Sequence, residues 1–164
     1  MGTYSKMKYI TTILILFLAS YLYCADKTAF TAGPMLHWNF GMNKVTFSFA
    51  LEGSYWHHNF NYNKHDNLFS LNAPKSIDFG MEWGKGVTRI YSEFQIGQTV
   101  TGISAGIVSE FKNSSVSFGF QSSVWANYIG GMDLRYRRID NHNFFCPGIY
   151  AKWPFTITGN WVGD

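Results

Sequence analysis

Apolar and polar residues alternate along most of this chain. In the stretch KVTFSFALEGSYW, residues 44–56, bulky apolar side chains hold one set of alternate positions, and small or polar side chains hold most of the other. A period of two residues predicts a β-strand with two unlike faces. The aromatic face of such a strand packs either against a protein core or against lipid, and the question is which of the two it meets here.

Eight segments carry this alternation and predict an all-β fold. They are residues 29–40, 45–56, 76–84, 87–97, 102–112, 115–125, 128–138 and 145–157. Connections rich in Gly, Asn, Ser or Asp separate most of them, as β-hairpins require; these are residues 41–44, 84–86, 112–115 and 140–143. The connections after the fourth and sixth segments are less clearly marked. One connection is long, residues 57–75, and no segment shows a helical period.

The length and number of the predicted strands favour a membrane barrel. The segments run to about 9–13 residues, whereas strands in globular proteins most often have about 5–6. A tilted strand that crosses a bilayer needs about 9–11 residues. Single-chain bacterial outer-membrane barrels have an even number of strands, and eight is the smallest number.

The polar face of the predicted strands carries six acidic and four basic residues among many Gly and Ser residues. The interior of an eight-stranded barrel is just wide enough for side chains, so small residues and a few opposed charges would fill it. The alternative is that these charges face solvent. We predict a polar network inside the barrel, formed by Glu52, Asp78, Glu82, Arg89, Glu93, Glu110, Asp133, Arg135, Arg137 and Lys152.

The Trp and Tyr residues fall mostly near strand ends, where transmembrane proteins place aromatic belts at the two membrane surfaces. Not all of them lie on the apolar phase, because Trp56 and Trp125 stand on the polar phase of their strands. A soluble core rich in aromatic residues is the alternative explanation. The overall composition, with 19% aromatic and 14% charged residues, is low in charge for a soluble protein, in which about a quarter of residues are charged.

Residues 1–25 are predicted to be a secretory signal peptide, followed by a barrel domain at 26–164. Lys6 and Lys8 precede a short apolar core, as in signal peptides, and an uncleaved anchor is the alternative. Tyr23 disfavours lipidation of Cys24, since bacterial lipoproteins carry a small residue before the acylated Cys. Removal of residues 1–25 leaves 11 basic and 10 acidic residues, a net charge of +1. With no basic stripe, nucleic-acid binding is not expected.

These features together resemble the small bacterial outer-membrane β-barrel proteins over about residues 29–157. Residues 148–155 look like the C-terminal assembly signal of that class, a Gly followed by alternating aromatic residues. The chain departs from the class in several respects. Pro154 interrupts the assembly signal, and the chain continues to Asp164. Pro34 and Pro154 lie in the first and last strands, where a proline removes a ladder hydrogen bond. If the N-terminus is periplasmic, the long connection 57–75 falls on the periplasmic side, where such barrels have short turns.

Three local patterns match part of a known catalytic or metal-binding motif. None of them is complete, so we predict no catalytic, cofactor or metal site. Residues 102–106 match G-x-S-x-G, but Ser104 lies within a strand pattern and no helix follows it, as a nucleophile elbow requires. Residues 141–143, around His142, are similar to part of the lipid A deacylase site, without its neighbouring Ser. The long connection holds a group of potential metal ligands that lacks a supporting scaffold; they are His57, His58, His65 and Asp66.

The sequence therefore predicts a single eight-stranded antiparallel up-and-down β-barrel of the bacterial outer membrane, in contact with outer-membrane lipid. It predicts a structural or surface-interaction role, no wide pore, no enzymatic activity and no cofactor. Residues 57–75 are the segment best placed to contact a partner. One alternative is a secreted or periplasmic lipocalin-like barrel, with its aromatic face turned inward around an apolar ligand. A second is an outer-membrane lipid hydrolase that uses His142.

Overall fold

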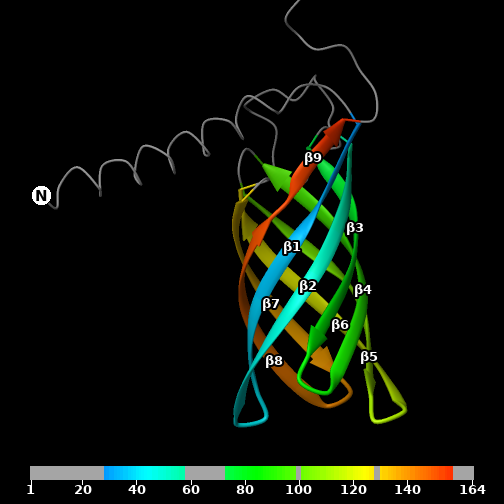
Figure 1. Ribbon diagram of the computed structural model, residues 1–164. Coiled ribbons are helices and arrows are strands. Elements are labelled where there is room, and N and C mark those ends of the chain that lie inside the picture. The colour runs from blue at the N-terminus through cyan, green and yellow to red at the C-terminus, as the bar shows by residue number, and fades with distance from the viewer. Residues whose placement is uncertain (1–27, 58–72, 99–100, 128–129, 157–164) are drawn as a thin grey trace, which may run out of the picture.

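A computed structural model of the chain describes residues 28–57, 73–98, 101–127 and 130–156. These residues form antiparallel β-strands joined mainly by tight turns (Figure 1). The strands are β1 (Thr28–Gly41), β2 (Lys44–His57), β3 (Lys75–Gly84), β4 (Val87–Gln98), β5 (Thr101–Lys112), β6 (Ser115–Ala126), β7 (Gly130–Ile139), β8 (His142–Ala151) and β9 (Trp153–Thr156). Across these ranges, no helix is long and apolar enough to span a membrane.

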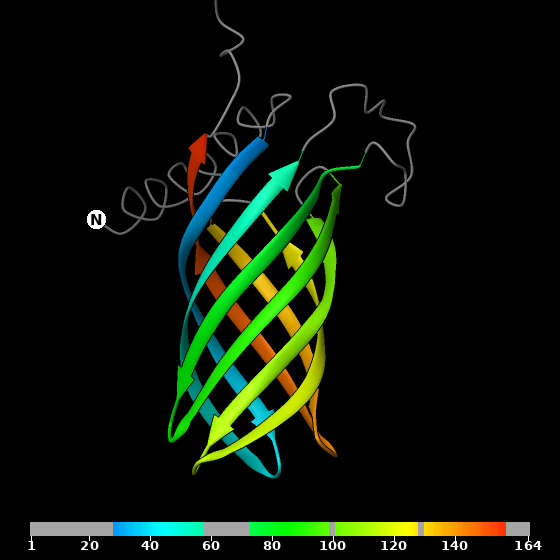
Figure 2. The same ribbon diagram turned by 90° about the vertical axis from the view of Figure 1, so that its right-hand side faces the viewer.

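The strands close into a barrel. Each strand from β1 to β7 pairs with the next one along the chain, and β1 also pairs with β8 and β9. Figures 1 and 2 show that the strands run obliquely to the barrel axis and surround it on all sides. The predicted all-β, eight-stranded antiparallel barrel is thus confirmed, with β8 and β9 together forming the eighth strand of the wall.

That eighth strand is interrupted at Lys152, where the sequence predicted one continuous segment, 145–157. Met35 pairs with Tyr150 and Ala32 pairs with Trp153, but the ladder is broken between these two pairs. Pro34 faces the break from β1, and it has no backbone N–H to donate. The prediction of a single segment was wrong at this point because the proline of the neighbouring strand, distant in sequence, decides where the ladder can continue.

Four hairpins with two-residue turns lie at one end of the barrel, which we call the hairpin end; it is at the bottom of Figure 1. Their turns occupy residues 42–43, 85–86, 113–114 and 140–141, as predicted. Each turn contains a residue with positive φ, such as Asn43 (57°), Gly86 (70°), Asn113 (48°) and Asp140 (51°). Turns of this kind match the twist of the paired strands. The opposite end, where β1 begins and β2 ends, we call the terminal end.

The two faces of the wall differ sharply. The apolar phase of every strand points outward, and large side chains such as Phe118 (72% exposed) and Phe79 (63% exposed) stand on the outer surface. The polar phase points into the barrel and is buried along most of its length, with exposed members such as Thr46 and Ser115 next to the hairpin turns. Trp56 and Trp125 are buried inside, with their rings edge to face at 5.6 Å. The aromatic phase of KVTFSFALEGSYW therefore lies outside the barrel.

Candidate functional site: the charged barrel interior

The structure places all ten charged residues of the predicted network inside the barrel. Nine of them are at most 6% exposed, and Glu110, near the hairpin end, has a side chain that is 13% exposed. They come from β2, β3, β4, β5, β7 and the break between β8 and β9. Burial of a charge costs free energy unless the charge is paired and hydrogen-bonded. The contacts of these residues, from the terminal end to the hairpin end, therefore show which partner compensates each charge.

Near the terminal end, Lys152 compensates two carboxylates. Its ammonium group donates to Glu52 and, at 2.9 Å, to the hydroxyl of Ser54, and it lies 4.0 Å from Asp78. Asp78 also accepts hydrogen bonds from Gln95 and from Ser76, the latter at 2.9 Å. The interruption of the eighth strand thus coincides with Lys152, the cation that lies between Glu52 and Asp78.

In the middle of the barrel, Arg135 is surrounded by acceptors. Its Nη2 donates to Glu52 Oε2 at 3.2 Å and lies 3.6 Å from Glu93 Oε2, and its Nε lies 3.3 Å from Asp133 Oδ2. The guanidinium stacks 4.7 Å from the ring centre of Tyr91, whose hydroxyl donates to Glu52 at 2.7 Å. Planar guanidinium groups suit this combination of ion pairing and stacking.

Toward the hairpin end, Glu82 binds two arginines. Arg137 donates to both of its carboxylate oxygens, at 2.8 Å and 2.5 Å, and Arg89 donates to Oε1 at 2.7 Å. Arg89 continues the chain of contacts to Glu110 at 2.8 Å. The guanidinium of Arg89 also lies 5.6 Å from the ring centre of Phe144. These four side chains, from Glu82, Arg137, Arg89 and Glu110, therefore fill the interior next to the hairpin end.

Several other polar residues belong to the network and were not predicted from the sequence. His37 is fully buried, with Nε2 3.1 Å from Asp133 and Nδ1 3.6 Å from Glu82, so it connects the middle group to the Glu82 group. The others that were missed are Asn39, Tyr91, Gln95, Gln121 and the free Cys146, all buried. Each lies on the same alternate phase as the charged residues, and a search of that phase for any polar side chain would have found them.

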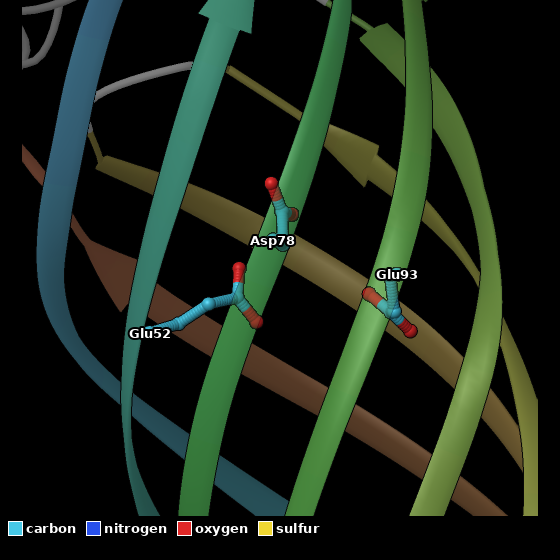
Figure 3. A group of neighbouring side chains, drawn as sticks. All are labelled: Glu52, Asp78 and Glu93. Carbon is cyan, nitrogen blue, oxygen red and sulfur yellow. The ribbon is translucent and has the colours of Figure 1, made fainter.

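Three carboxylates of this interior lie close enough to suggest a metal site. Figure 3 shows Glu52, Asp78 and Glu93 extending from β2, β3 and β4, and an oxygen of each lies within 4.8 Å of the others. Each already has protein partners, however: Lys152 and Arg135 for the first, Gln95 and Ser76 for the second, and Ser104, at 3.0 Å, for the third. Their arrangement with adjacent cations resembles an ion-pair network more than a metal centre.

The other sequence patterns do not assemble a site. Ser104 is buried in β5 and hydrogen-bonds to Ser123 at 2.7 Å. His142 is exposed at the start of β8, and within the described ranges it has no hydrogen bond or ion pair. His57 is the last residue of β2 and is exposed, whereas residues 58–72, with the remaining potential metal ligands, lie outside the described residues.

An apolar outer surface around a closed barrel with an ionic interior is the architecture of the smallest transmembrane β-barrels. The resemblance to small outer-membrane barrels is therefore confirmed at the level of architecture. The lipocalin alternative requires the opposite arrangement, with the aromatic phase lining the interior, and the outward position of that phase contradicts it.

Comparisons with known proteins concern the fold alone. No protein-family model matches the chain, and no curated protein matches its sequence. Among solved structures, it is similar to a de novo designed transmembrane β-barrel (9% identity, 79% of this chain and 98% of that chain, TM-score 0.49). It is also similar to Ail, the attachment invasion locus protein of Yersinia pestis (10% identity, 80% and 100%, TM-score 0.30), and to Ail in complex with the heparin analogue sucrose octasulfate (11%, 79% and 99%, TM-score 0.31). The assignment of the fold rests on the strand pairing of this chain itself.

Proposed function

We propose that the protein is a bacterial outer-membrane β-barrel with a structural or surface-interaction role, without a wide pore and without enzymatic activity. The observation that carries the proposal is the pairing of an apolar exterior with a filled ionic interior. Exposed apolar side chains on every strand would aggregate in water, whereas lipid is a suitable solvent for them. The aromatic residues near strand ends suit the two membrane surfaces; they include Trp38, Trp83, Trp153 and Phe155.

The packed interior supports a role other than conduction. The ion pairs of Arg135, Arg137 and Lys152 cross the space in which a channel would run. Near the terminal end, the cavity next to Arg135 and Lys152 has a volume of about 10 Å³, the space of one water molecule. Residues 57–75 are a further candidate for contact with a partner.

Fractionation and electrophoresis test this proposal. Outer and inner membranes would be separated by density, and the extracted protein would be run in SDS with and without boiling. We expect the protein in the outer-membrane fraction, extractable only with detergent, and migrating differently before and after boiling because a closed barrel resists SDS. Recovery in the soluble fraction without a heat-dependent shift would contradict the proposal. Stepwise conductance in planar bilayers would contradict the absence of a pore.

A further inference from the structure

The hairpin end of the barrel opens into a cavity of about 400 Å³. This volume is within the range of about 300–1,000 Å³ that is typical of small-molecule sites. Its floor is formed by Arg89 and Glu110, which are paired with each other, and by the ring of Phe144. Hydroxyl and amide groups line its walls, among them Ser115, Ser117, Thr46 and Asn113.

Three lysines surround this cavity, one from each of three hairpins. Lys44 follows the first turn, Lys85 lies in the second and Lys112 precedes the third, and all three line the cavity. Lys44 and Lys112 fall on the inward phase of their strands: Lys44 continues the series of Ser48 and Glu52, and Lys112 follows Glu110 by two residues. Their side chains thus approach the mouth from separate parts of the wall.

The charges at this mouth differ from those deeper in the barrel, where every cation has a carboxylate partner. Among the described residues, Lys44, Lys85 and Lys112 make no ion pair or hydrogen bond. The acidic residues that line the same cavity are Glu110, which is bound by Arg89, and Asp140. Three free ammonium groups therefore face a concave space with a low-dielectric wall, an arrangement that concentrates positive potential.

From this geometry we propose that the hairpin-end cavity binds a phosphate-bearing ligand. Phosphate oxygens accept charge-assisted hydrogen bonds from ammonium groups, and the neighbouring hydroxyl and amide groups add neutral donors. Three lysines from three hairpins favour a ligand with more than one phosphate over a single small anion. The ligand is either the headgroup of a lipid or a soluble phosphate ester. The proposal is independent of the outer-membrane assignment, because the cavity and its lysines belong to the barrel itself.

Calorimetric titration with inositol hexakisphosphate tests the site. The folded protein would be purified in a maltoside detergent, which carries no phosphate. We expect saturable binding that weakens as the ionic strength rises. In the triple variant K44Q/K85Q/K112Q, we expect the Kd to rise by about tenfold or more, since three charge-assisted contacts are lost. The three single variants should show intermediate losses, and they keep the test valid if the triple variant does not fold.

The matched control is Arg138→Gln. Arg138 lies at the same end of the barrel and is exposed, but it stands on the outward phase of β7 and does not line the cavity. Its loss removes the same charge from the molecule, and we expect the Kd to change by about twofold or less, as for a screened surface charge. The heat-dependent shift in SDS should persist in every variant, which would show that the barrel is intact.

Two results would overturn the proposal. One is the absence of saturable binding to the wild-type protein, and the other is an equal loss of affinity in Arg138→Gln and in the triple variant. Competition by short-chain phosphatidic acid distinguishes the source of the phosphate. Displacement of the inositol phosphate would point to a lipid headgroup, and failure to displace it would point to a soluble ester. A negative result here would leave the barrel proposal standing, because fractionation tests that separately.

Discussion

Glu82 shows how a single buried residue connects distant parts of the wall. It lies on β3 and binds Arg89 on the adjacent β4 and Arg137 on β7, across the interior. β3 and β7 share no backbone pairing, so this carboxylate holds together strands that the sheet does not join directly. Arg135 makes comparable cross-barrel contacts from β7, with Glu52 on β2 and Glu93 on β4.

Substitution of Glu82 should destabilise the barrel, because Arg89 and Arg137 both depend on its carboxylate. We expect Glu82→Gln to lower the free energy of unfolding by about 3–5 kcal/mol, because two buried guanidinium groups lose their shared counter-ion. Tryptophan fluorescence during urea unfolding in lipid vesicles would measure it. The control is Glu110→Gln on the floor of the hairpin-end cavity, where the Glu110 side chain is 13% exposed and the loss should be about 1 kcal/mol. Equal effects of the two substitutions would show that the depth of Glu82 does not matter.

Gly106 marks a place where two strands approach closely. A Cβ atom at this position would lie 1.9 Å from the carbonyl oxygen of Ser92 on the neighbouring strand. We expect Gly106→Ala to destabilise the barrel by about 1–3 kcal/mol through overpacking. Gly130→Ala is the matched control, since a Cβ atom there would meet only the backbone carbonyl oxygen of Tyr150, at 3.7 Å. The effect of this substitution should stay within about 0.5 kcal/mol. The same vesicle unfolding assay applies, and equal midpoints for the two variants would contradict the expectation.

At the scale of elements, the alternation of residues was enough to predict most of the wall. The period of two has a direct physical cause, since successive side chains of a strand point to opposite faces. The turn residues were also informative, because positions such as Asn43 and Gly86 favour the positive φ that tight hairpins need. The strands from β1 to β6 consequently begin and end within one residue of their predicted bounds.

The contacts inside the barrel could not be predicted in the same way. Alternation assigns His37 and Glu82 to the interior phase but does not show that they meet, because their separation depends on the stagger between strands around the whole barrel. The break at Lys152 was missed for a related reason, since its cause lies at Pro34 in another strand. The local sequence is enough to predict whether a residue faces inward. The contacts between inward-facing residues depend on how the whole barrel closes.

The outward phase of β3 allows a test of what surrounds the barrel. Phe79 lies near the middle of this strand and is 63% exposed. In a bilayer, Phe79→Arg should cost about 2–4 kcal/mol, while Val116→Arg, next to a hairpin turn, should cost only about 0–1 kcal/mol. The comparison uses unfolding midpoints in vesicles. If both substitutions left the midpoint unchanged, the outer surface would be facing water.

At the scale of the whole molecule, closure depends on one long-range pairing. β1 meets β8 and β9, and the partners Met35 and Tyr150 are far apart in the chain. Three of the four prolines lie in these strands, namely Pro34, Pro147 and Pro154. Each removes a ladder donor from its strand, and the register between β1 and these strands is interrupted, whereas β1 and β2 pair without a break.

A disulfide across this pairing would test closure in the membrane. Leu36 and Ile149 are directly opposed on the outward phase, and opposed antiparallel residues have Cα atoms about 4.5–5.5 Å apart, within the range of disulfides. In a background with Cys24 and Cys146 replaced by Ser, we expect Leu36→Cys and Ile149→Cys to form an intramolecular disulfide, seen as a shift in non-reducing electrophoresis. The pair Leu36→Cys and Phe118→Cys should not form one. An open sheet would give no disulfide in either case.

Ala29 pairs with Thr156, so the two ends of the barrel segment lie opposite each other. The chain could therefore begin and end at another turn while the strands keep their neighbours in the barrel. A circular permutant, with residues 28 and 156 joined by a short linker and new termini placed in the turn between Met42 and Asn43, should close into the same wall. In such a chain, the proline-bearing strands would become consecutive and would pair as neighbours early in folding. We expect this permutant to regain its heat-dependent shift in SDS faster on refolding than the parent, and slower recovery would show that this pairing does not limit closure.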